Sequence, residues 1–168
     1  NYIPSRLKDF VIDIEDRRFY EHKGNDFQGV ARAALENVKA GKIVQGGSSL
    51  TQQLARNILK DNRKSLSRKI RETFKAIEIE SQFSKDEILD LYFNNVYFGK
   101  NIRGIRAAGL HYFQKEVDKL TQTELLTLLT ILRGPNYYIN HPDKIVNRFQ
   151  LLNQTLYNHK IISKSRFR

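Results

Sequence analysis

The sequence contains no cysteine, methionine or tryptophan, and only three prolines in 168 residues. Without cysteine the chain can form neither a disulfide nor a thiolate metal site. No stretch approaches the roughly 18 consecutive apolar residues of a membrane-spanning helix. Because the chain starts at Asn1 and has no methionine, we expect the initiator, and any signal or membrane anchor, to lie upstream.

The charge of the chain is strongly positive, with 29 basic and 18 acidic residues and a formal net charge of +11. Most basic surfaces are only solvated, so the excess by itself favours a polyanionic partner weakly. Nucleic acid, an anionic membrane and a phosphorylated ligand all fit this charge.

Helical signals recur along the whole chain, and no run alternates as a strand would. The Ser/Thr-x-x-Glu/Gln spacing of a capping box predicts three helix starts, at Ser49, Ser84 and Thr121. Asp26 is expected to cap a helix that stops at Gly41. We find no repeat and no flexible linker, so the prediction is an all-α protein with residues 1–168 forming one domain of seven to nine helices.

Glu15 is the first candidate catalytic residue. It lies four residues after Val11, so on a helix it flanks an apolar stripe, and Phe19, Tyr20 and His22 follow it. Two interpretations remain open from the residues alone. Glu15 is either part of a mixed-charge helix end on the surface or a general base beside an aromatic wall.

A basic segment between Gly46 and Arg71 is the second candidate site. Its glycines, N-cap serine, side-chain amides and cations all suit a phosphate group. Glu72 follows at once and has Arg68 and Lys69 within one helical turn, so it forms either a plain helical salt bridge or part of the site. The cations of this segment are Arg56, Lys60, Arg63, Lys64, Arg68, Lys69 and Arg71.

Taken in order, these segments resemble the peptidoglycan glycosyltransferase family (glycosyltransferase family 51). This family comprises the glycosyltransferase domain of bifunctional penicillin-binding proteins and the monofunctional transglycosylases. Small departures occur, such as Arg56 where the family commonly has lysine and Lys64 where it has arginine. The motifs that carry the resemblance are Glu15-Asp16-x-x-Phe19-x-x-His22-x-Gly24-x-Asp26, Gly46-Gly47-Ser48-Ser49-x-Thr51-Gln52-Gln53-x-x-Arg56-Asn57, Arg68-Lys69-x-x-Glu72-x-x-x-Ala76 with Glu80 closing it, and Lys85-x-x-Ile88-Leu89-x-x-Tyr92-x-Asn94.

The resemblance implies a lysozyme-like helical fold with a head and a smaller membrane-contacting jaw, which we place at approximately residues 26–47. It implies polymerisation of lipid II into a β-1,4-linked glycan chain, with inversion and release of undecaprenyl pyrophosphate. The place of action would be the extracytoplasmic face of the bacterial inner membrane, with an N-terminal anchor outside this chain. Moenomycin would be an inhibitor.

The resemblance also implies roles for individual residues. Glu15 and Glu72 are the expected catalytic residues. No cofactor is required, and no spacing in the sequence demands a metal, although the family leaves room for Mg²⁺ or Mn²⁺ at the pyrophosphate. The expected substrate-binding residues are Ser48, Gln52, Gln53, Arg56, Asn57, Lys64, Arg68 and Lys69.

Two other functions compete with glycosyl transfer. A lytic muramidase would also use a glutamate, but cleavage at a neutral glycosidic oxygen needs no phosphate-binding cations. A nucleic-acid-binding module would account for the charge but not for Glu15 and Glu72, whose carboxylates oppose a phosphate backbone. We therefore expect a glycosyltransferase that does not bind nucleic acid.

Overall fold

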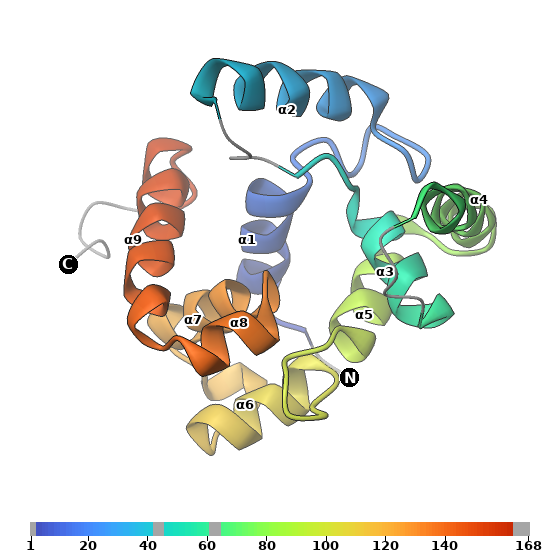
Figure 1. The fold of residues 1–168 in the computed structure, drawn as a ribbon. Helices are drawn as coiled ribbons and strands as arrows, with labels where there is room; N and C mark the ends of the chain where they lie inside the picture. The colour runs from blue at the N-terminus through green and yellow to red at the C-terminus, as the bar shows by residue number, and fades with distance from the viewer. Residues whose placement is uncertain (1–2, 42–45, 61–64, 163–168) are drawn as a thin grey trace. The chain divides into compact units, whose positions relative to one another are not determined.

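The computed structural model describes residues 3–41, 46–60, 65–162 of the chain. Within these ranges every regular element is a helix, and one isolated antiparallel bridge joins Tyr97 to Arg103. The predicted all-α class is confirmed. The elements, in chain order (Figure 1), are α1 (Ser5–Glu15), α2 (Phe27–Ala40), α3 (Leu50–Leu59), α4 (Leu66–Gln82), α5 (Lys85–Asn95), α6 (Ile105–Phe113), the short 3-10 helix η1 (Val117–Lys119), α7 (Gln122–Leu132), α8 (Pro135–Asn140) and α9 (Asp143–Asn158).

The chain divides into two compact units, Glu15–Tyr92 and the combination of Asn1–Ile14 with Phe93–Arg168. Both boundaries fall at helix residues, one at the end of α1 and the other within α5. The jaw expected at residues 26–47 stays a prediction, and its Ile43 and Val44 lie outside the described residues. No helix in the described part is both long and apolar enough to cross a membrane.

The predicted helix starts are largely confirmed. Ser49 and Thr121 each form a complete capping box, with Gln52 and Glu124 as the partners. Ser84 forms the third, because the Glu87 carboxylate accepts from its backbone N–H at 2.8 Å.

Asp26 is the exception among these helix starts. It occupies the N-cap position of α2 as predicted but makes no side-chain cap hydrogen bond. Its carboxylate instead pairs with Arg18 at 3.2 Å, because a guanidinium is a stronger partner than a backbone N–H.

The unit formed by Asn1–Ile14 and Phe93–Arg168 has a conventional apolar core. Helix α7 is buried along most of its length and packs against α6, α8 and α9. Leu7, Phe10 and Val11 of α1 are completely or almost completely buried, as the apolar stripe of this helix predicts.

Helix α4 in the other unit has the opposite pattern. Its buried residues are Glu72, Ala76 and Ile79. Four large apolar residues of α4 are exposed, at 78% for Leu66, 48% for Ile70, 69% for Phe74 and 48% for Ile77. A charged group therefore occupies the inward face of α4 at the place where an amphipathic helix normally buries an apolar one.

The capping box of α7 gives a direct test of the fold. Thr121→Ala removes the hydroxyl that accepts from the Glu124 backbone N–H, so it is expected to lower the free energy of unfolding by about 1 kcal/mol. Thr123→Ala, two residues further along and exposed like Thr121, is the matched control and should change it by less than about 0.5 kcal/mol. Chemical denaturation measures both, and equal effects would contradict the cap.

Candidate active site

Glu15 is the last residue of α1 and is partly exposed. Its Oε2 accepts a hydrogen bond from Gln53 Nε2 at 3.2 Å, and the Tyr92 hydroxyl donates to Gln53 Oε1, also at 3.2 Å. Tyr92 is fully buried, so its hydroxyl holds the Gln53 amide in one orientation. The amide then fixes one Glu15 oxygen while the side chain stays accessible to solvent.

Asp16, next to Glu15, is buried and anchors the end of this segment. Both of its carboxylate oxygens lie within 3.0 Å of His22 Nε2, and Oδ2 also accepts from the Leu50 backbone N–H at 2.9 Å. Asp16, which directly follows Glu15, therefore links the end of α1 to Leu50, the first residue of α3. Sequence reasoning quoted Asp16 only as part of a motif and gave it no role of its own.

Glu72 is the centre of the basic site. Its side chain is completely buried and faces two guanidinium groups and one ammonium group. Arg56 donates from Nε to Oε1 at 2.9 Å and from its terminal nitrogen to Oε2 at 3.3 Å. Arg68 forms an ion pair with Oε1 at 3.1 Å, and Lys69 lies 3.8 Å from Oε2.

Lys69 connects this cluster to the start of α3. Its Nζ donates to Ser48 Oγ and to Gln52 Oε1, both at 3.0 Å. Burial, together with the nearby positive charges of Arg56 and Arg68, lowers the pKa of Lys69 below its ordinary value, although Glu72 acts in the opposite direction. An anion at this place would relieve the repulsion among the cations.

A second polar network, which sequence reasoning missed, supports the inner side of α3. Thr51 Oγ1 donates to Glu80 Oε1 at 2.6 Å, and Lys85 Nζ donates to the same oxygen at 2.8 Å. Lys85 also donates to the His22 carbonyl and lies 4.4 Å from the centre of the Phe19 ring. The available signal was that these residues fall at motif positions in the sequence.

The structure brings most of the predicted site residues together. Glu72 is not an exposed helical salt bridge, because it is completely buried. Gln52 and Gln53 are adjacent on α3, but Gln52 accepts from Lys69 whereas Gln53 donates to Glu15. Asn57 is partly exposed on α3, and Lys64 lies outside the described residues.

The carboxylates in the described part of the chain do not form a metal site, since no three His, Cys, Asp or Glu side chains gather there. Both oxygens of Glu72 are already engaged by cations. Glu72 is therefore poorly suited to hold a divalent cation, which needs free carboxylate oxygens.

Comparison with known proteins identifies the family. The model of the family described as "Transglycosylase" matches residues 1–157. The chain is 45% identical over 146 residues to penicillin-binding protein 1F of Bacillus subtilis, covering 86% of this chain and 20% of that protein. It is 40% identical over 167 residues to penicillin-binding protein 1A of Vibrio cholerae, covering 98% and 20%.

Penicillin-binding protein 1B of Buchnera aphidicola is 39% identical over 171 residues, covering 98% of this chain and 23% of that protein. The chain thus spans between a fifth and a quarter of the length of these three relatives. It belongs to the transglycosylase family, as its motifs indicated, and the domain is an enzyme of the glycosyltransferase class.

The lowered pKa of Lys69 predicts a pH dependence of anion binding. Sulfate keeps a constant charge in alkaline solution, so its affinity for the domain should fall as Lys69 loses its proton, beginning below the ordinary lysine value of 10.5. The loss should be about threefold, because the Lys69 side chain is 38% exposed and its contact with an anion is partly screened by water. Titrations at constant ionic strength measure it.

Two variants make this test specific. Lys69→Arg keeps its charge at these pH values and should abolish the decrease. Lys75→Arg, at a surface lysine paired with Glu78, should leave the wild-type profile unchanged. A profile that is the same in all three proteins would show that Lys69 does not meet the anion.

Proposed function

We propose that this domain polymerises lipid II into a β-1,4-linked glycan chain, as a peptidoglycan glycosyltransferase of bacterial cell-wall synthesis. One observation carries the proposal. Two adjacent residues of α3 serve two chemically different groups, with Gln53 on the Glu15 carboxylate and Gln52 on the Lys69 ammonium. The carboxylate that can accept a proton and the ammonium that can bind a leaving phosphate are therefore both hydrogen-bonded to the start of α3.

Glu15 is the general base in this proposal. The 4-hydroxyl of the acceptor N-acetylglucosamine attacks C1 of the donor N-acetylmuramic acid, and its proton passes to the Glu15 carboxylate as the new bond forms. An alcohol is a poor nucleophile until this proton leaves, so a positioned base is required. The hydrogen bond from Gln53 orients the carboxylate for this proton transfer.

The cations act on the leaving group. As the C1–O bond of the donor breaks, its electron pair goes to the undecaprenyl pyrophosphate, which gains negative charge. Arg56, Arg68 and Lys69 outnumber the single charge of Glu72, so the cluster retains positive charge for this phosphate. Glu72 acts by holding the cations in place, since its own carboxylate is buried behind them.

Ser48, Asn57 and Lys64 complete the proposed substrate-binding set. Ser48 keeps Lys69 oriented through its hydroxyl. The mechanism as proposed uses no divalent cation, and Glu72, whose two oxygens are engaged by Arg56, is not expected to be a ligand for one. Mg²⁺ or Mn²⁺ bound by the pyrophosphate itself stays a prediction. A nucleic-acid partner is not expected.

The base is tested by Glu15→Gln, which keeps the size of the side chain but cannot accept the proton. Polymerisation of lipid II should fall at least about a hundredfold, the lower limit for loss of a general base. Glu78→Gln, an exposed carboxylate of α4, is the control and should keep full activity. Moenomycin affinity should remain within about twofold in both variants, because neither change removes a cation. Retained turnover in Glu15→Gln would exclude this role.

We further propose that α2 and the segment after it form a jaw that contacts the membrane. A substrate with a polyprenyl tail stays in the bilayer, so the site that uses it must reach the lipid surface. Phe27, Val30 and Leu35 of α2 are exposed by 78%, 46% and 54%, and only Ala33 of this helix is buried. Such a helix, on a chain with net charge +11, suits shallow insertion among anionic headgroups.

Co-sedimentation with vesicles tests the jaw. The domain should bind vesicles that contain anionic lipid, and binding should weaken as salt screens the charges. Phe27→Asp and Leu35→Asp should reduce the binding that remains at high salt, because they remove apolar contact. Leu151→Asp, at a residue of α9 exposed by 55%, is the control and should have no effect. A domain that ignores vesicles under all conditions would exclude the jaw.

A further inference from the structure

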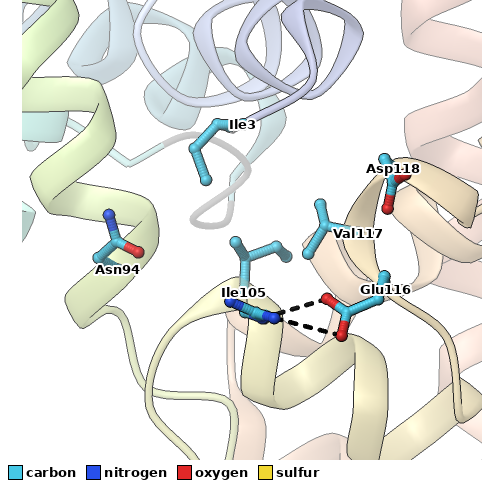
Figure 2. Close-up of a pocket in the computed structure, with 7 residues that line it drawn as sticks. Ile3, Asn94, Ile105, Glu116, Val117 and Asp118 are labelled. Atoms are coloured by element: carbon cyan, nitrogen blue, oxygen red, sulfur yellow. Dashed lines mark hydrogen bonds and ion pairs between the residues drawn. The ribbon is translucent and has the colours of Figure 1, made fainter. Parts of the chain in front are cut away.

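A cavity of about 410 Å³ lies in the unit formed by Asn1–Ile14 and Phe93–Arg168, in the part of the chain that carries no proposed catalytic residue. Its volume falls in the range of small-molecule sites, about 300–1,000 Å³. Figure 2 shows the side chains that surround it, which come from the N-terminal segment, α5, α6 and the turn at η1. The lining residues are Ile3, Asn94, Ile105, Arg106, Glu116, Val117 and Asp118.

Two glycines bring the walls of the cavity together. A Cβ at Gly104, whose φ is +83°, would lie 2.8 Å from the Asn94 carbonyl oxygen, so glycine is needed where α5 meets the start of α6. A Cβ at Gly109 would lie 3.0 Å from the Lys115 carbonyl oxygen. Glycine there lets the turn before Val117 approach α6 closely.

The floor of the cavity is aliphatic. Ile3, Ile105 and Val117 extend toward one another in Figure 2. Ile3 and Val117 keep 7% and 6% of their surface accessible, whereas Ile105 is fully covered and supports them from behind. Such a floor favours an apolar group over water, because burial of apolar surface contributes about 25 cal/mol per Å².

The rim of the cavity carries a net negative charge. Arg106 and Glu116 neutralise each other through two contacts, Nε to Oε2 at 3.1 Å and the terminal nitrogen to Oε1 at 3.3 Å, both drawn in Figure 2. Asp118 remains as an exposed carboxylate, and in the described part of the chain no cation pairs with it. This local negative charge contrasts with the net charge of +11 on the whole chain.

We propose that this cavity binds an amphipathic organic cation, in which an apolar group of about one ring's size carries a protonated amine. The aliphatic floor takes the apolar group, and Asp118 takes the ammonium at the rim. An anion of the same shape would meet repulsion from Asp118, and a neutral analogue would lose the ionic contact. This site is separate from the proposed glycosyl transfer and does not depend on it.

Binding of 2-phenylethylamine to the ¹⁵N-labelled domain, followed by NMR, tests the proposal. Two probes of matched shape, 2-phenylethanol and 3-phenylpropionate, separate charge from apolar contact. The amine should perturb amides of residues 105, 106 and 116–118 at millimolar concentration, about fivefold more tightly than the alcohol, as one partly screened ion pair allows. The carboxylate should bind most weakly. Equal affinities for amine and alcohol, or perturbations elsewhere, would overturn the assignment.

Two surface variants change the rim charge in opposite directions. Asp118→Asn removes the negative charge and should weaken amine binding about fivefold, to the level of the alcohol. Arg106→Gln releases Glu116 from its partner, so amine binding should become tighter by a similar factor. Asp143→Asn, an exposed carboxylate at the start of α9, is the control and should leave amine affinity unchanged.

The absence of opposite shifts in the first two variants would exclude the proposal. Since no lipid substrate is present, this outcome is independent of the polymerisation assay. An unchanged amide spectrum outside the cavity verifies that each variant is folded.

Discussion

The ion cluster around Glu72 is the interaction on which the unit Glu15–Tyr92 depends. A completely buried carboxylate loses several kcal/mol of hydration, so it is tolerated only with well-placed partners. Arg56 comes from α3, whereas Arg68 and Lys69 come from the first turn of α4 itself. Removing Glu72 would leave three neighbouring cations without a compensating charge. The cluster therefore joins α3 to α4 and at the same time keeps cations concentrated at one place.

Helix α3 connects the ion cluster to Glu15, through Gln52 and Gln53. Its first turn is held by the capping box of Ser49, by Asp16 on the Leu50 backbone N–H and by Glu80 on Thr51. These contacts are all inside the unit and none is with the proposed substrate. They set the direction from which Gln52 and Gln53 extend. The positions of Glu15 and of the cation cluster thus depend on a few buried polar contacts that take no part in the proposed reaction.

Local signals in the sequence were sufficient for the helix starts. Ser49 and Thr121 cap their helices as their spacing indicated, because a capping box involves residues only three positions apart. Asp26 shows the limit of this reasoning. Its position was right, but Arg18, eight residues away, competes for its carboxylate.

The site was predictable as a set of residues but not as a set of contacts. The motifs named the carboxylates, amides and cations as candidates, whereas the residues alone left Glu72 open between a surface salt bridge and a site residue. The burial of Glu72 and the separate partners of Gln52 and Gln53 depend on the packing of α3 against α4. Asp16 and Glu80 were overlooked for the same reason, since their partners are 34 and 29 residues away.

The inverted pattern of α4 has a practical consequence for handling the protein. Leu66, Phe74 and the other outward apolar residues of this helix contribute little to its core, because the inward face is made by Glu72, Ala76 and Ile79. Polar replacements on the outer face can therefore reduce self-association in dilute buffer without disturbing the ion cluster. The outer face of α4 can be redesigned for crystallisation, while the buried Glu72 carboxylate still holds α4 against α3.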